Sequence, residues 1–253
     1  MKARFAGQVA KEPSDPGAGE DAYRLAIEIG LAALSDGASE SFDSKTWANR
    51  LVDGFVRDPA LTADWLDRAV TDYRGHHDRG RMSWSRQAAF DRGSFATLLG
   101  VEQCVERETV DIVCVGDSLA VLLDGNERVA SFPYERAAEF QRRPELFGTD
   151  GALNDFFNAP DFFIRHHRTW RYSDRERPVV LCMTDALGEW ALRREEEGRP
   201  VWERLAGIAR AADFEALVLD ERRTKALRVD DTTLITLVLV ERCERELPDA
   251  RAI

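Results

Sequence analysis

Apolar residues recur along the chain at two spacings, one typical of helices and one of strands. Trp47, Leu51 and Phe55 fall four residues apart, so they share one face of a predicted helix that Asp43 or Ser44 would cap. Further helices are predicted at 61–75 and 186–198, with shorter helical pieces up to residue 223. Apolar runs bounded by turn residues predict strands near 5–9, 22–35, 94–104, 109–118, 119–125, 128–132, 178–185 and 232–241.

These elements come in blocks rather than in strict alternation. Strands open the chain, two helices follow, a group of strands comes next, and more helices precede a last strand. Blocks of this kind favour an α+β fold built in layers over alternating parallel units. We find neither a repeat nor a linker, so we predict a single domain over residues 1–253 with an irregular insert at about 134–177.

Charge and composition exclude some classes of partner. A formal net charge of −11 argues against a nucleic-acid partner, because backbone phosphates require clustered Lys and Arg. No run of about 18 uncharged apolar residues occurs and no signal-peptide pattern opens the chain, so we expect no membrane partner. The four cysteines show no paired motif, and Cys114 and Cys182 lie in apolar runs as buried free thiols would. We therefore predict a reducing, cytoplasmic setting.

Acidic residues stand where apolar strands begin or end. They are Glu20, Asp21, Asp36, Asp117, Asp185, Asp230 and Asp231. Each alone, and above all an Asp-Gly pair after a strand, is most simply a turn. Several carboxylates that converge away from water would repel one another unless cations hold them. Oxygen ligands without histidine or cysteine suit Mg²⁺ or Mn²⁺. The pattern therefore indicates either separate turns or one metal site.

Six short motifs stand in order along the chain. They are GED at 19–21, SDGAS at 35–39, GSFAT at 93–97, VGDS at 115–118, TDAL at 184–187 and DDTTLITL at 230–237. Together they resemble the metal-dependent Ser/Thr protein phosphatases of type 2C, as a divergent, bacterial-like member, over about residues 7–240. The resemblance implies a four-layer α/β/β/α sandwich of two antiparallel sheets flanked by helices. It also implies a metal centre in a cleft at the edge of the sheets.

The resemblance assigns ligands to that metal centre. Asp36 would bridge two ions, the carbonyl of Gly37 would bind one of them, and Asp185 and Asp230 would complete the other. Asp231 stands where the family often has Asn, so the last ligand is either Asp230 or Asp231.

Three more acidic residues belong to the implied centre. Glu20 and Asp21 would hold metal-bound water or bind metal directly, and Asp117 matches the position that bacterial relatives use for a third ion. The implied cofactor is Mg²⁺ or Mn²⁺, as two ions or as three. No catalytic side chain is needed, because a water activated between two cations would be the nucleophile.

The arginine that the family commonly carries just before Glu-Asp is absent. Lys11 or Arg24 would be the nearest replacements. The second half of the insert is rich in arginine, which is either a solvated loop or, as in the family, a flap beside the metal site. As a flap it would let Arg165, Arg168 or Arg171 bind the substrate phosphate through a guanidinium.

The expected activity is therefore hydrolysis of phosphoserine and phosphothreonine in proteins by a signalling phosphatase. Its partners would be a phosphorylated protein substrate, namely a Ser/Thr kinase or its target. The alternative is a catalytically weak or inactive regulator that keeps the fold and binds a phosphorylated or kinase partner. A metal centre that cleaves a small phosphorylated molecule is a third hypothesis.

Overall fold

Two five-stranded antiparallel sheets pack face to face in the computed structural model, which describes residues 1–12 and 14–240. The first sheet has the order β1 (Lys2–Val9), β12 (Thr232–Val238), β11 (Pro178–Met183), β7 (Leu119–Asp124) and β8 (Glu127–Phe132). The second has the order β10 (His167–Arg171), β6 (Thr109–Val115), β5 (Leu98–Cys104), β3 (Leu31–Ser35) and β2 (Ala22–Ala26). The strands are antiparallel throughout both sheets.

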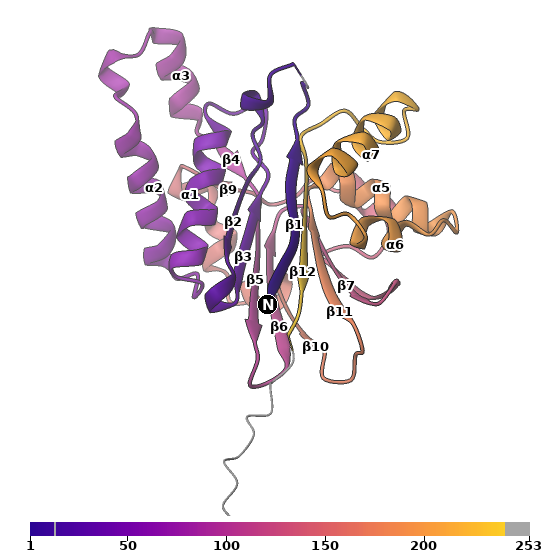
Figure 1. Ribbon diagram of the computed structural model, residues 1–253. Coiled ribbons are helices and arrows are strands. Elements are labelled where there is room, and N and C mark those ends of the chain that lie inside the picture. Colours follow the sequence, from indigo (N-terminus) through magenta and orange to yellow (C-terminus); the bar gives the residue numbers. More distant parts are fainter. Residues whose placement is uncertain (13, 241–253) are drawn as a thin grey trace, which may run out of the picture.

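Helices cover the outer face of each sheet (Figure 1). The second sheet carries α1 (Ser44–Arg57), α2 (Ala63–His76), α3 (Trp84–Arg92) and α4 (Phe162–His166), and the first carries α5 (Asp185–Glu196), α6 (Val201–Ala206) and α7 (Ala211–Arg223). The predicted α+β class and the α/β/β/α sandwich are confirmed. Within the described residues, no helix is long and apolar enough to cross a membrane.

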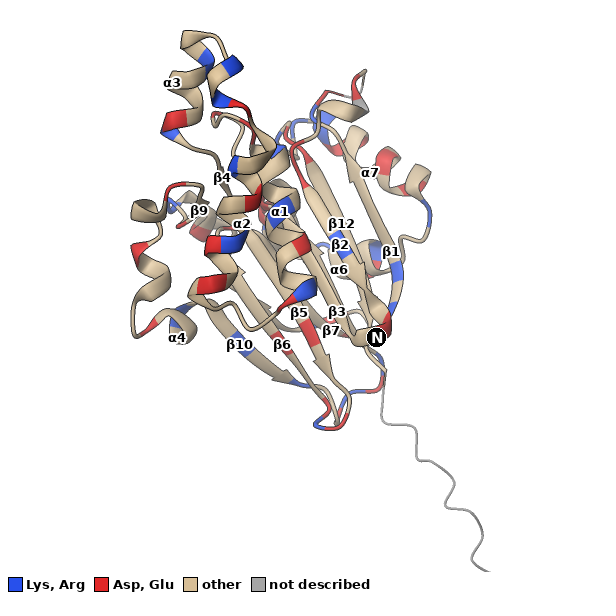
Figure 2. Cartoon of the chain, turned by 90° about the vertical axis from the view of Figure 1, so that its left-hand side faces the viewer, with Lys and Arg blue, Asp and Glu red and all other residues tan. Residues whose placement is uncertain are grey.

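The core has three layers of apolar side chains. One lies between the sheets and includes Leu34, Leu99 and Ile235, and the other two lie between a sheet and its helices. A strand in this arrangement is buried on both faces, which is why β11 is buried at every position instead of alternating. In Figure 2 the strands are mostly uncharged, and charges of both signs lie on the helices and loops.

The α1 helix begins and packs as its sequence predicts. The side chain of Asp43 accepts a hydrogen bond from the Thr46 amide at 3.2 Å, so Asp43 is the cap. Trp47, Leu51 and Phe55 are buried on one face. The thiols of Cys114 and Cys182 are free and buried, also as predicted, whereas Cys243 lies outside the described residues.

The segment predicted as an insert is more regular at its end than expected. Its first part consists of short turns, β9 (Phe147–Gly148), which pairs with β4 (Phe95–Ala96), and α4. Residues His167–Arg171 then form β10, the edge of the second sheet, paired with β6. The sequence gives little sign of this strand, because it is a mostly exposed edge strand in which His167 and Trp170 alone are partly buried.

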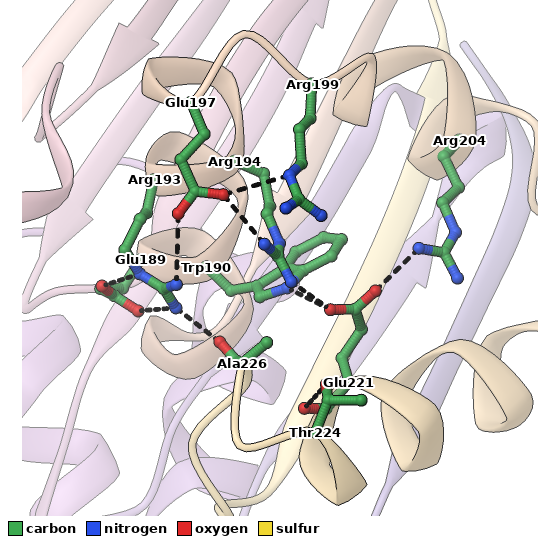
Figure 3. Close-up of polar contacts among 10 residues, drawn as sticks. All are labelled: Glu189, Trp190, Arg193, Arg194, Glu197, Arg199, Arg204, Glu221, Thr224 and Ala226. Atoms are coloured by element: carbon green, nitrogen blue, oxygen red, sulfur yellow. Dashed lines mark hydrogen bonds and ion pairs between the residues drawn. The ribbon is translucent and has the colours of Figure 1, made fainter.

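A network of charged side chains joins the three helices on the first sheet (Figure 3). The carboxylate of Glu221 on α7 accepts hydrogen bonds from Arg194 at 2.7 Å, Arg204 at 2.9 Å and the indole of Trp190 at 3.1 Å. The side chains of Glu221 and Arg194 are only 14% and 12% exposed. This network holds α5, the helix that begins at Asp185, and α6 against α7.

We expect Glu221→Ala to lower the free energy of unfolding by about 2 kcal/mol, because it leaves the nearly buried Nη2 of Arg194 and the buried indole N–H of Trp190 without this acceptor. Urea denaturation measures this change. The control is Asp220→Ala in the same helix, which removes an exposed ion pair with Arg223 and should cost less than about 0.5 kcal/mol. Equal losses in the two variants would contradict the structural role of Glu221.

Candidate metal centre

Four aspartates from separate parts of the chain line one pocket of about 270 Å³. Asp36 follows β3, Asp117 lies in the turn between β6 and β7, Asp185 begins α5 after β11, and Asp230 precedes β12. The first two follow strands of the second sheet, and the other two adjoin strands of the first. The pocket therefore spans the edge of the sandwich, and its remaining lining residues are Gly37, Ala38, Ser39, Thr97, Pro144 and Leu146.

Thr97 fixes the backbone of Asp36. The Asp36 amide donates to Thr97 Oγ1 at 2.8 Å, and the Thr97 amide donates to the Asp36 carbonyl at 2.9 Å. Thr97 Oγ1 also lies 3.0 Å from the hydroxyl of Ser118. Gly116 has a φ of +109°, and a Cβ there would lie 2.5 Å from Thr97 Cγ2, so this close approach requires glycine. The GSFAT motif therefore fixes Asp36 through Thr97, and the VGDS motif in turn contacts Thr97.

Gly37 brings the N-terminal acids close to the pocket. A Cβ on Gly37 would lie 2.8 Å from the Glu20 carbonyl and 2.9 Å from Ser44 Cβ, so glycine alone permits this contact. The Glu20 carboxylate accepts a hydrogen bond from the Ser44 hydroxyl at 2.5 Å. Glu20 thus stands next to Asp36 and Gly37 although it does not line the pocket itself.

Asp21 has a buried carboxylate oxygen without a partner. Its side chain is 6% exposed, and Oδ2 accepts a hydrogen bond from Thr233 Oγ1 at 2.6 Å. Oδ1 has no hydrogen-bond partner among the described residues. An unpaired buried carboxylate oxygen is costly, and a cation would satisfy it.

Asp230 and Asp231 have different environments. Asp230 lines the pocket. The carboxylate of Asp231 instead accepts hydrogen bonds from the backbone amides of Lys11 at 2.7 Å and Glu20 at 2.6 Å. This geometry favours Asp230 as the ligand and gives Asp231 the role of holding the Glu20 segment in place.

Burial and mutual repulsion raise the pKa values of four of these carboxyl groups. Burial, opposed by the Thr233 hydrogen bond and reinforced by neighbouring aspartates, raises the pKa of Asp21 to about 8. Burial and then the charge of Asp21 raise the pKa of Asp36 well above its usual range. Burial and the charge of Asp185 raise the pKa of Asp117 to about 6 and also raise that of Asp230. The acids are therefore close enough to repel one another when ionised, and a bound cation would reduce that repulsion.

No family model matches the chain, and no curated protein matches it. Solved structures do match. The photosystem II phosphatase PBCP is 10% identical with a TM-score of 0.59, and the match covers 93% of this chain and 97% of that one. The serine/threonine phosphatase Stp1 from Staphylococcus aureus is 16% identical with a TM-score of 0.52, covering 94% and 95% of the two chains. The Mycobacterium tuberculosis serine/threonine phosphatase PstP/Ppp is 16% identical with a TM-score of 0.52, and the match covers 94% of this chain and 98% of that one. The chain has the type 2C phosphatase fold.

The acids of this type 2C fold are not drawn together onto a common point. Among the described residues, no group of three or more His, Cys, Asp or Glu side chains is close enough to hold a metal ion. A guanidinium lies among them instead, because Arg228 forms ion pairs with Asp185 and, at 3.5 Å, with Asp230. The unpaired oxygen of Asp21 and the four aspartates of the pocket still fit a hard divalent cation. The motif analysis missed Arg228, since a single arginine two residues before an acidic pair belongs to no motif.

The arginines predicted as a flap have other partners. Arg165 pairs with Glu145 at 2.6 Å and Asp161 at 3.1 Å. Arg168 donates to the carbonyls of Ile164 and His167, and Arg171 ends β10.

The first half of the insert reaches the pocket of the type 2C fold through Pro144 and Leu146. Glu145, the partner of Arg165, lies between the pocket residues Pro144 and Leu146. Arg165 is therefore one ion pair away from the pocket wall. Phosphate binding by the three flap arginines stays a prediction.

Proposed function

We propose that the chain is a Mg²⁺- or Mn²⁺-dependent phosphatase that hydrolyses phosphoserine and phosphothreonine in proteins. The observation that carries the proposal is the gathering of Asp36, Asp117, Asp185 and Asp230 in one pocket, beside the unpaired oxygen of Asp21. Carboxylates with this surplus of negative charge would repel an anionic phosphate unless cations accompany them. With cations present, the same pocket attracts a phosphoryl group.

The residues that would hold the metals are among those that line the pocket. Asp36 and the Gly37 carbonyl lie together after β3, and Asp185 and Asp230 lie together on the first sheet. Asp36 would contribute a ligand to each of two ions, and Asp117 would hold a third. The cations would supply positive charge for the phosphoryl oxygens and lower the pKa of a bound water.

The N-terminal acids would act behind these ligands. Glu20 and Asp21 adjoin Gly37 and Thr233 rather than the open pocket, so they would orient bound water or bind a cation from behind. The hydrogen bonds from the Lys11 and Glu20 amides to Asp231 fix this segment relative to β12. The protein therefore contributes rigid placement of charges rather than a nucleophilic side chain.

A phosphoprotein is the substrate class we favour. Two of the structural neighbours are serine/threonine phosphatases by name, and the third is a phosphatase of photosystem II. The volume of the pocket, about 270 Å³, is large enough for a phosphorylated side chain. We accordingly propose a phosphorylated Ser/Thr kinase or its target as the partner, in a cytoplasmic setting. A small phosphorylated molecule is the competing substrate.

One observation favours the alternative of a weak or inactive regulator. Arg228 occupies the space between Asp185 and Asp230, and the acids do not converge on a common point. A protein that keeps this arrangement when cations are present would bind phosphorylated partners without cleaving them.

Metal removal separates these functions. We expect the purified chain to release phosphate from a phosphothreonine peptide with Mn²⁺, and to lose the activity by at least about a hundredfold after chelation and recover it on adding Mn²⁺ back. Phosphate release is measured with a colorimetric phosphate assay. The rate with the peptide is compared with the rate with a small phosphomonoester at equal concentration. Binding of the peptide without turnover in saturating Mn²⁺ would support the regulator instead. Faster turnover of the small compound at equal concentration would favour the third hypothesis.

A further inference from the structure

Arg228 is the cation that the structure brings to the candidate metal centre. Its guanidinium forms a hydrogen-bonded ion pair with Oδ2 of Asp185, and the same nitrogen lies 3.5 Å from Oδ2 of Asp230. Both aspartates line the pocket. The positive charge of Arg228 thus rests on oxygens that, under the proposed function, would bind a metal ion.

A guanidinium and a divalent cation compete for such oxygens. Two cations held by the same pair of carboxylate oxygens repel one another at close range. The Arg228 side chain is 57% exposed, so it is free to leave by rotation of its own bonds, whereas the aspartate backbones are fixed by strand and helix ends. A metal ion that binds here would therefore displace the arginine.

The displaced guanidinium would remain at the pocket. On one side of Arg228, Leu227 is 1% exposed and anchored in the core. On the other side, the buried guanidinium of Arg222 donates to the Asp230 carbonyl and, at 2.8 Å, to the Ala10 carbonyl. Because the backbone is held at both sides, the side chain can change partners but cannot move far from the pocket.

A phosphoryl group is the partner that suits the freed arginine. A guanidinium binds phosphate oxygens with two parallel hydrogen bonds, which an ammonium or amide cannot reproduce. We propose that Arg228 changes partner on metal binding, from Asp185 and Asp230 in the metal-free protein to the substrate phosphoryl group in the loaded one. This inference rests on the proposed metal-dependent function and adds a substrate-binding residue to it.

Calorimetric titration of the full chain with Mn²⁺ tests the first half of this exchange. Loss of a partly exposed competing ion pair should make Arg228→Gln bind Mn²⁺ about three- to fivefold more tightly than the unaltered chain. Arg228→Lys keeps the charge and should bind Mn²⁺ as the unaltered chain does. The control is Arg68→Gln, which removes an arginine of similar exposure paired with Asp58 on the helical surface, and should change nothing.

Titration of the Mn²⁺-loaded proteins with inorganic phosphate tests the second half. We expect Arg228→Gln to bind phosphate about tenfold more weakly, with Arg228→Lys in between, because a charge-assisted bidentate contact is lost or reduced. The inference needs both changes, and either affinity staying unchanged in Arg228→Gln would overturn it. If the unaltered chain binds no Mn²⁺, the proposed function fails. If it binds Mn²⁺ and Arg228→Gln equals it, only the role of Arg228 fails.

Discussion

Asp36→Asn should reduce Mn²⁺-dependent phosphate release by at least about a hundredfold. Residues that only orient a metal ligand already change affinity or activity by roughly 10–100-fold, and Asp36 is proposed to touch both ions. Its position in the pocket is fixed through the backbone by Thr97. The loss should appear mainly in kcat, with Mn²⁺ affinity measured by calorimetry falling in parallel.

The substitution should leave the fold intact, which makes the result interpretable. Asparagine keeps the backbone hydrogen bonds to Thr97 and removes a carboxyl group that burial and neighbouring acids already disfavour as an anion. Asp67→Asn on the exposed face of α2 is the matched control and should keep full activity. Equal rates for the Asp36→Asn protein and the unaltered chain would contradict the metal-dependent mechanism.

The sequence predicted the parts of the site that periodic apolar strands carry with them. Asp185 follows a strand buried at all its positions, so its place at the end of β11 could be read from the chain. Asp36 follows the equally buried β3. Because strand ends in a sandwich lie along common edges, acids at several ends were expected to meet, and Asp36, Asp117, Asp185 and Asp230 do line one pocket.

What the sequence could not predict depends on side-chain pairing across the fold. Nothing in the order of residues indicates that Asp231 accepts hydrogen bonds from the amides of Lys11 and Glu20, more than 200 positions away. The pairing of Arg165 with Glu145 likewise depends on how the loop before β9 folds. Arg228 was missed for the same reason, since its two carboxylate partners are recognisable only once α5 and β12 lie side by side.

Asp21→Asn should stabilise the metal-free protein strongly at pH 8 and much less at pH 5. Burial raises the pKa of Asp21 to about 8, whereas in the unfolded chain the pKa would be near its ordinary value of 3.8. Between those two values the folded protein keeps a proton that the unfolded chain has lost. Stability attributable to this group therefore falls as the pH rises from about 4 to about 8, and the fall ends above the folded pKa.

The amide variant lacks this proton linkage, so its unfolding free energy should depend less on pH. Each pKa unit corresponds to about 1.4 kcal/mol, so the difference at pH 8 should be on the order of a few kcal/mol in favour of Asp21→Asn. Urea denaturation at both pH values, in chelator, measures it, with the exposed Asp220→Asn as control. Adding Mn²⁺ should reverse the order, because a cation satisfies the unpaired Oδ1 of Asp21 in the unaltered chain and not in the variant. Parallel pH profiles for the two proteins would mean that Asp21 is ionised and already paired without metal, and would remove the strongest reason for a cation beside it.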